Sequence, residues 1–456
     1  MGKTGKCFLA FVMSVVFTFA AALPARAAVT LEDLAKRVEA LEAENASLKA
    51  EVGALKGAQA VQAADVAEVK TKTMTVVSSV PVASPAPSGN FLKTGMDISL
   101  YGFIKADAVL TSRDAGNTTT GITQYNALRP NSATGGDDPE AHLSAQDTRL
   151  GFKIKAPDLD NGAKLTGQIE FDFAGTSSSG TVGTYNPRLR LAFAQIDFDK
   201  WAVNAGQNWD IFAPMNDNLL NPGVLYRAGN LGTRHPQVSL INKWGNVLGG
   251  KLTTKIGAID SDDPLIQDSG MPVAAAYAGY EKTVLGVKST LGLGGMYGKL
   301  NLPTNGVSHD PIYAVTTGLT LAFTDWLSLK GEGFAGAGLN KFQGGPAQTT
   351  GNATLTSASK PLPVKGGFLE LTLNPIKKTE VNFGYGIDDA NEDMTAVDRG
   401  ATTVVWDYNK TYYTNLKYNL SKDLLVGLEY QRFSTRWADG VQSSDNRVES
   451  SLILKF

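Results

Sequence analysis

The last eleven residues of the chain alternate between apolar and polar side chains over most of their length. A strand with two such faces needs hydrocarbon on one side and water on the other, as a strand of a transmembrane β-barrel does. The alternative is an amphipathic edge strand of a soluble β-sandwich. One parity carries Val448, Leu452, Leu454 and Phe456, and the other carries Arg447, Glu449, Ser451 and Lys455.

The same period of two extends from about Gly95 to the carboxyl terminus. Between Asp97 and Leu110 the even-numbered positions are apolar or small, while the odd-numbered ones include Lys105 and Asp107. About 360 residues, at roughly 22 per strand and loop, predict an all-β transmembrane barrel of 16 antiparallel strands, give or take two. Further alternating runs lie near 149–155, 164–173, 187–198, 281–293, 312–322, 366–373, 379–386, 411–418 and 424–433.

The connections between these runs fall into two classes. Short ones such as 199–200, 324–325, 375–378 and 421–423 are typical of periplasmic turns, and Trp201 and Trp326 lie beside them, where interfacial aromatic residues belong. A soluble sandwich does not require this asymmetry. Longer polar stretches, expected to be outer loops, occupy 112–146, 211–236, 261–272, 341–363 and 388–402.

The amino-terminal 27 residues have the features of a secretory signal peptide. Lys3 and Lys6 precede an apolar run from Phe8 to Leu23, and Ala25-Arg26-Ala27 offers a small-x-small cleavage site. We therefore expect residues 1–27 to be removed. An exported chain with a transmembrane barrel, here residues 95–456, is expected in the outer membrane of a Gram-negative bacterium.

Residues 28–70 are expected to form a periplasmic coiled coil. Positions Leu31 to Leu55 follow a heptad repeat, and the charges at g and e′, such as Arg37 with Glu42, are opposite in sign on a parallel neighbour. Valine at a, leucine at d and one asparagine favour a parallel dimer, while a short solvated helix is the alternative. The oligomerising seam comprises Leu34, Val38, Leu41, Asn45, Leu48, Val52 and Leu55.

A linker is predicted between the coiled coil and the barrel. Residues 71–94 contain Pro81, Pro85 and Pro87 among small residues, which prevents a regular helix and favours an extended segment.

Composition and charge exclude several classes of protein. The sole cysteine, Cys7, lies in the signal, so the mature chain has no disulfide and no thiolate metal site. Loss of three basic residues with the signal leaves 39 against 44 acidic ones, a formal charge of −5 that argues against a nucleic-acid partner. With 48 glycines and a mean hydropathy of −0.11, the chain suits a barrel with a polar lumen.

A barrel of this size leaves an aqueous lumen, so passive diffusion is the expected function. Arg188 and Arg190 share a parity opposite Leu189, Leu191 and Phe193, which places both guanidinium groups in the lumen. Converging guanidinium groups would favour carboxylates or phosphates. The candidate pore residues also include Arg149, Lys153 and Lys164 on neighbouring strands and Arg227 and Arg234 in the long loop 211–236.

Two other interpretations of these charges remain open. Each strand arginine could be a solvated wall residue balanced by Glu170, Asp172 or a loop acid. If Asp107, Glu170 and Asp172 offset the basic set, the pore would be neutral or sugar-selective.

Three short motifs stand out in the predicted barrel: Asp97-Ile-Ser-Leu-Tyr-Gly-Phe-Ile-Lys-Ala-Asp107, Arg188-Leu-Arg-Leu-Ala-Phe193 and Ala205-Gly-Gln-Asn-Trp-Asp210. Together with the order of segments, they resemble the DcaP-type trimeric porin family. The free aromatic carboxyl terminus also resembles the closing-strand signal of bacterial outer-membrane proteins. The family resemblance implies a 16-stranded trimer with a periplasmic coiled coil that takes up dicarboxylates or other small anions.

Enzymatic and tethering roles are the rivals to a porin. The three histidines, His142, His235 and His309, fall in predicted loops, and no local nucleophile–base motif accompanies them. Residues 260–263 and 388–389 are acidic, but solvated loop acids are expected there rather than a calcium site. We thus expect no enzyme activity, metal or cofactor. The tether alternative has the coiled coil contacting peptidoglycan while the barrel serves as an anchor.

Overall fold

The computed structural model describes residues 95–456 with several gaps. The predicted signal peptide, coiled coil and linker lie outside the described residues. No helix within the described part of the chain is long and apolar enough to cross a membrane. The gaps cover residues 114–137, 176–185, 214, 222, 224, 285–286, 303–307, 347–360, 391–405 and 438–439.

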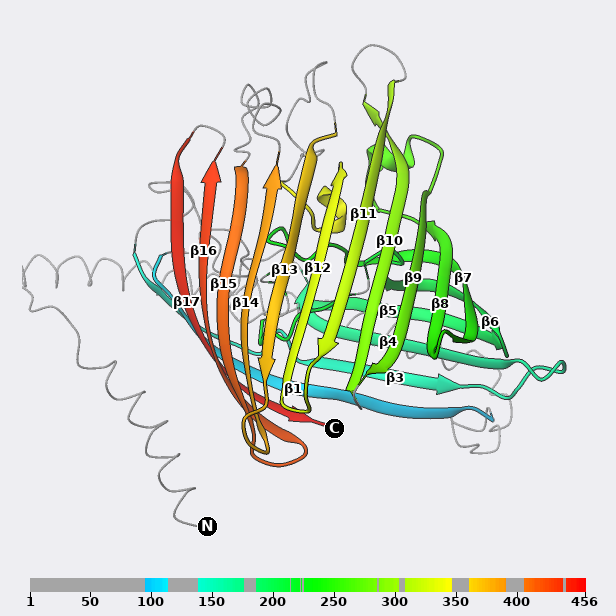
Figure 1. Cartoon of the computed structure of the whole chain (residues 1–456), viewed down its shortest axis with the longest axis horizontal. Helices are drawn as coiled ribbons and strands as arrows, with labels where there is room; N and C mark the ends of the chain where they lie inside the picture. The colour runs from blue at the N-terminus through cyan, green and yellow to red at the C-terminus, as the bar shows by residue number, and fades with distance from the viewer. Residues whose placement is uncertain are drawn as a thin grey trace, which may run out of the picture. The chain divides into compact units, whose positions relative to one another are not determined.

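In the described part of the chain, seventeen antiparallel strands form one closed sheet (Figure 1). From β3 to β17 each strand pairs with its neighbour in sequence, and β1 closes the ring by pairing with β17 on one side and with β2 and β3 on the other. The strands are β1 Asp97–Thr111, β2 Glu140–Ser144, β3 Arg149–Lys155, β4 Lys164–Gly175, β5 Asn186–Phe198, β6 Trp201–Trp209, β7 Arg234–Val247, β8 Gly250–Ile259, β9 Val273–Val284, β10 Val287–Leu302, β11 Ser308–Ala322, β12 Leu327–Ala337, β13 Pro363–Leu373, β14 Thr379–Ala390, β15 Trp406–Asn419, β16 Leu424–Trp437 and β17 Gln442–Lys455.

Strands β2 and β3 occupy one position in the ring. β2 pairs with residues 107–111 of β1, and β3 pairs with residues 97–103 of the same strand. The described barrel therefore has 16 strand positions, which confirms the number predicted from the sequence. A short helix α3 (Pro264–Gln267) and a 3₁₀ turn η2 (Asn340–Phe342) lie in the connections after β8 and β12.

The two faces of the strands divide as the alternation predicts. On β1, Ile104 is 52% exposed whereas its neighbour Lys105 is 2% exposed. On β17, Leu452 is 48% exposed and Glu449 is fully buried. Apolar side chains outside and polar side chains inside are the reverse of a soluble sandwich, which excludes that alternative.

An arginine on the outer face should be costly. Leu293, 59% exposed on the outer face of β10, is expected to lose about 2–4 kcal/mol of folding stability when replaced by arginine, because hydrocarbon solvates the charge poorly. Thr290 lies on the other face, opposite Glu281 of β9. Thr290→Arg is the matched control and should cost less than about 1 kcal/mol. Urea unfolding in lipid vesicles measures the free energy of unfolding of both variants. Equal losses of stability in the two variants would contradict the assigned faces.

Four local predictions from the sequence were wrong. The run 281–293 spans the end of β9 and the start of β10, not one strand. The expected loop 112–146 contains β2, and residues 388–389 belong to β14. The three histidines lie in strands β2, β7 and β11. The last three errors come from reading a polar strand segment as a loop, because lumen-facing strands carry as many polar residues as loops do. The first comes from a tight turn that does not interrupt the alternation between β9 and β10.

Candidate functional site: the charged interior of the barrel

The connection between β6 and β7, residues 210–233, folds into the barrel and is called the internal loop here. Phe212 and Leu231 of this loop are fully buried. They belong to one apolar cluster with Ile259 of β8, Ile312 of β11 and other wall residues. Apolar side chains on the inner wall of β8 to β13 are thus covered by the loop instead of facing water.

Four carboxylates on the inner wall hold the backbone of the internal loop. They come from β12, β13, β14 and β16 and are between 0 and 6% exposed. Charge-assisted bonds of this kind fix both position and orientation. Leu231 N donates to Glu332 Oε1 (2.8 Å), Asn218 N to Glu370 Oε2 (2.8 Å), Gly229 N to Asp388 Oδ1 (2.7 Å) and Leu220 N to Glu429 Oε2 (2.7 Å).

Glycines on the inner wall allow the internal loop to approach this closely. A methyl group at Gly386 of β14 would overlap the carbonyl oxygen of Ala228. A methyl group at Gly294 of β10 would overlap the carbonyl oxygen of Phe212. The loop therefore packs backbone to backbone against the wall, from β10 round to β16.

The basic cluster lies on the other side of the lumen, on β3, β5 and β7, and comprises Arg149, Arg188, Arg190 and Arg234. Two carboxylates of β4, Glu170 and Asp172, form ion pairs with the first three of these arginines. Arg188 contacts Asp172 at 2.6 Å, Arg190 contacts Glu170 at 2.7 Å and Asp172 at 2.9 Å, and Arg149 lies 3.5 Å from Glu170.

A β-bulge at Arg190 changes which residues of β5 face the lumen. Leu189 pairs with Phe171, but Leu191 pairs with Glu170, so Arg190 is the additional residue. Residues directly opposite each other share a face. Leu191 and Phe193 consequently lie on the lumen side, which corrects the prediction that they point outward. Arg188 keeps the orientation predicted from the sequence, opposite Asp172.

The members of the basic cluster differ in exposure. The side chain of Arg190 is 4% exposed, and its partners Glu170 and Asp172 are 7% and 2% exposed. Arg188 and Arg149 are 41% and 23% exposed. Arg190 therefore holds the carboxylates in place, while Arg188 and Arg149 present guanidinium groups to water.

Arg234 has no carboxylate within ion-pair distance among the described residues. Arg234 is the first residue of β7, so the prediction that it lies in the loop was wrong. Its guanidinium group stacks on Trp209, 4.9 Å from the ring centroid. The charges of Arg188 and Arg190 act on it unfavourably. β6 pairs with β5 only as far as Gln207. Beyond Gln207, the end of β6 and the paired start of β7 no longer follow β5, which brings Arg234 toward the other arginines.

Among the described residues, the other predicted pore residues form no ion pair with the carboxylates of this cluster. Lys153 stacks over Tyr101 at 5.0 Å, and Lys164 begins β4 opposite Asp197. Arg227 donates to the backbone carbonyl oxygens of Gly345 and Asn340, so it ties the internal loop to the connection after β12.

A second charged group was not predicted. Lys105 of β1 lies 2.7 Å from Asp107, 3.2 Å from Glu449 and 3.5 Å from Asp147. All four side chains are almost fully buried. The sequence shows that Lys105 and Asp107 share a face. Asp147 comes from the turn between β2 and β3, and Glu449 arrives only when β17 closes the barrel against β1.

His235 also differs from its prediction as a turn residue. It lies in β7, is 4% exposed, and its Nδ1 is 2.7 Å from Oδ1 of Asp210. Asp210 also accepts the backbone N–H of Thr233, so the pair joins the two ends of the internal loop.

Asp217 in the internal loop provides a pH test of loop docking. Burial, and next the charge of Glu370, raise its pKa to about 6 from 3.8. Since the docked form has the higher pKa, the contribution of Asp217 to docking is fully present below about pH 3.8, is lost as the pH rises from there through 6, and no longer changes with pH above that value. Asp217→Asn should remove the dependence and strengthen docking at pH 7.5 by roughly 1–3 kcal/mol. Amide hydrogen exchange across residues 215–231 measures this, and an unchanged pH profile would contradict it.

Comparisons of sequence find no counterpart: no protein-family model matches the chain, and no curated protein matches it. Solved structures do match. The outer-membrane channel DcaP of Acinetobacter baumannii has a TM-score of 0.62 at 18% identity, over 81% of this chain and 99% of that chain. This chain has the fold of the DcaP channel.

Two further structures share the DcaP-like barrel fold. The anion-selective porin from Comamonas acidovorans has a TM-score of 0.53 at 14% identity, covering 79% of this chain and all of that chain. OmpF of Salmonella typhi, in complex with daunomycin, has a TM-score of 0.51 at 11% identity, covering 80% and 98%. The 16-stranded barrel expected from the resemblance to DcaP-type porins is therefore confirmed.

Proposed function

We propose that this protein is an outer-membrane porin that admits small hydrophilic solutes by passive diffusion and prefers anions, including dicarboxylates. The observation that carries the proposal is the composition of the basic cluster. Four guanidinium groups face only two carboxylates there, and Arg234 has no ion-pair partner among the described residues. Guanidinium groups bind carboxylates and phosphates by charge and by paired hydrogen bonds.

The acids of the opposite wall do not cancel this preference. Glu332, Glu370, Asp388 and Glu429 lie beneath the internal loop and accept its backbone N–H groups. Their oxygens are turned to the loop and removed from water. A solute passing along β3 to β5 would meet Arg188 and Arg149 before it met these carboxylates.

A neutral or sugar-selective pore is the second candidate. It is supported by the ion pairs of Arg149, Arg188 and Arg190 with Glu170 and Asp172, which offset much of the local charge. In that case the ion pairs would shield most of the basic charge, and selectivity between anions and uncharged solutes would be weak.

Swelling of liposomes that contain the purified protein separates the two candidates. We expect succinate to enter several times faster than an uncharged polyol of similar size, and a diammonium compound of that size to enter slowest. Equal rates for succinate and the polyol would support the neutral pore. No swelling with any solute would remove the porin function altogether.

The surroundings of the barrel follow from the same proposal. An outer apolar face fits outer-membrane lipid, and we infer a homo-oligomer, a trimer by resemblance, with a periplasmic coiled coil formed by residues 28–70. Deletion of residues 28–90 tests this. Loss of the oligomer with an intact envelope would make the segment an assembly device, whereas a weakened envelope with normal permeation would support contact with peptidoglycan.

A further inference from the structure

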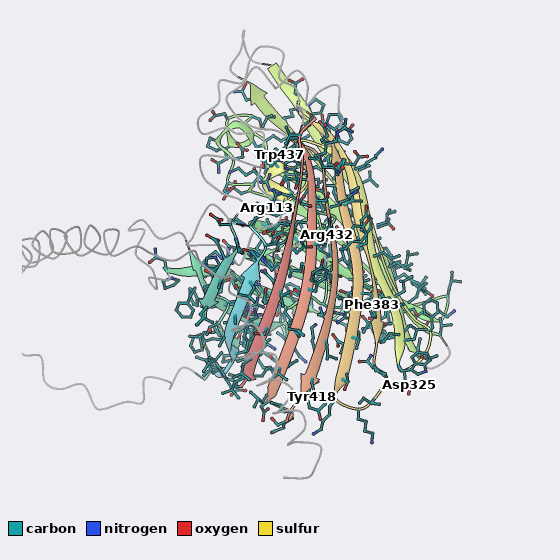
Figure 2. All side chains as sticks on the ribbon, turned by 90° about the vertical axis from the view of Figure 1, so that its left-hand side faces the viewer. Arg113, Asp325, Phe383, Tyr418, Arg432 and Trp437 are labelled. Carbon is teal, nitrogen blue, oxygen red and sulfur yellow. The ribbon has the colours of Figure 1, made fainter. Side chains whose placement is uncertain are left out.

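The outer face of β15, β16 and β17 changes from apolar to polar at one height. On β16 the outward side chains run Val426, Leu428 and Tyr430 and then become charged at Arg432. On β15 the change follows Tyr412, which pairs with Arg432. Tyrosines at such a boundary mark the level of the lipid headgroups. Figure 2 shows Arg432 on β16 between Tyr418, near the turn end, and Trp437, near the loop end.

Three cations surround one serine at this level. Ser434 of β16 lies between Arg432 and Arg436 on the same face of the strand, and it pairs with Lys410 of β15. Lys410 is thus a diagonal neighbour of both arginines, with Cα atoms about 7–8 Å apart. On the other side Ser434 pairs with Ser444 of β17, which adds a second hydroxyl group. We call Lys410, Arg432, Ser434 and Arg436 the outer basic site.

Acids neutralise this site only in part. Arg436 lies 3.7 Å from Asp407. Lys410 stacks over Tyr408 at 5.0 Å, and Arg432 donates to the amide oxygen of Asn446 at 3.3 Å. Within the described part of the chain, neither Lys410 nor Arg432 has a carboxylate at ion-pair distance.

Lys365 of β13 provides the contrast. It also points outward, and it is 3.2 Å from Asp389 of the neighbouring strand. Lys365 carries the same charge on the same sector of the barrel, but an acid beside it compensates that charge.

From this placement we propose that the outer basic site binds the phosphate group of a lipid in the leaflet at the loop end of the barrel. A phosphate accepts hydrogen bonds through several oxygens, so two guanidinium groups, an ammonium group and the Ser434 hydroxyl can bind it together. The site lies on the face that contacts lipid, just beyond the tyrosines, where a headgroup phosphate is present and a soluble anion would have to displace one. It is separate from the lumen and does not depend on the selectivity of the pore.

Binding of lipid A by the full-length detergent-purified protein tests the proposal. Native mass spectrometry and a titration would compare lipid A carrying both phosphates with the same lipid after dephosphorylation. The phosphorylated form should bind at least tenfold more tightly. Removal of two cations in Lys410→Gln with Arg432→Gln should weaken binding by about a hundredfold, at about tenfold for each charged contact. Lys365→Gln is the matched control and should change binding by less than about twofold.

Two additional measurements keep the outcome clear. Ser434→Glu places a carboxylate in the centre of the site and should abolish binding, whereas Ser434→Asn should retain it; heat-modifiable mobility on gels shows that each variant folds. Millimolar inorganic phosphate that displaced the lipid completely would assign the site to free phosphate instead. Equal binding of both lipid forms, or equal losses in the double variant and Lys365→Gln, would overturn the proposal. Conductance should remain at the unaltered value in all of these variants.

Discussion

The double variant Arg188→Glu with Arg234→Glu is expected to turn an anion-preferring pore into a cation-preferring one. The two substitutions remove two positive charges from the basic cluster and add two negative ones, next to Glu170 and Asp172, which are already there. The cluster would change from an excess of guanidinium groups to an excess of carboxylates. In a low-dielectric passage such a change reverses the sign of the local potential. The reversal potential under a potassium chloride gradient should therefore change sign.

Lys153→Glu with Lys164→Glu is the matched control for this variant. It makes the same change in net charge on the neighbouring strands β3 and β4, but among the described residues neither lysine forms an ion pair with Glu170 or Asp172. Its reversal potential should stay on the anion side. If both double variants shifted the potential equally, the overall charge of the lumen and not the basic cluster would set selectivity.

Arg190 is unsuitable for this experiment. It lies between Glu170 and Asp172, and all three side chains are almost fully excluded from water. Removing one partner of a buried ion pair costs about 3–5 kcal/mol, because the remaining charges lose their compensation. A change in selectivity in that variant would be confounded by a change in folding.

Replacement of Glu429 by alanine is expected to release part of the internal loop. The two carboxylate oxygens of Glu429 accept hydrogen bonds from four donors. These are the backbone N–H groups of Leu220 and Asn221 and the side-chain amides of Asn415 and Gln431. Each buried donor left without an acceptor costs about 1–3 kcal/mol. The loop residues around Leu220 should then leave the wall, which would raise open-channel noise and conductance and speed amide exchange at residues 218–221.

Glu429→Gln is the control with the same shape. Its amide keeps one acceptor oxygen, so some of the four donors remain satisfied and the effect should be clearly smaller than that of alanine. Single-channel recordings of the three proteins measure the difference. Equal noise in the alanine variant and the unaltered protein would mean that Glu429 does not hold the loop.

The sequence predicts the barrel well because alternation is a local property. Val448, Leu452 and Leu454 are enough to show which face of β17 meets lipid, and the spacing of turns sets the number of strands. The bulge at Arg190 could not be predicted in the same way. It is defined by the register against β4, and alternation within β5 alone continues past it without a break.

The candidate site is predictable only in part for the same reason. Arg149 lies on β3, and Arg188 and Arg190 lie on β5, the two strands that flank β4, so their approach to one another follows from strand order. Glu332, Glu370, Asp388 and Glu429 each look like solvated wall acids, because the internal loop that binds them comes from a distant part of the chain. Glycines such as Gly386 are the sequence signal that could have suggested a close backbone contact on the inner wall.

The reversal potential of the unaltered full-length protein in a planar lipid bilayer, under a tenfold potassium chloride gradient, tests the central claim most directly. A basic cluster with more guanidinium groups than carboxylates, facing acids bound beneath the internal loop, predicts a potential on the chloride side of zero. A potential on the potassium side would contradict the assignment of the basic cluster as the part of the lumen that selects ions.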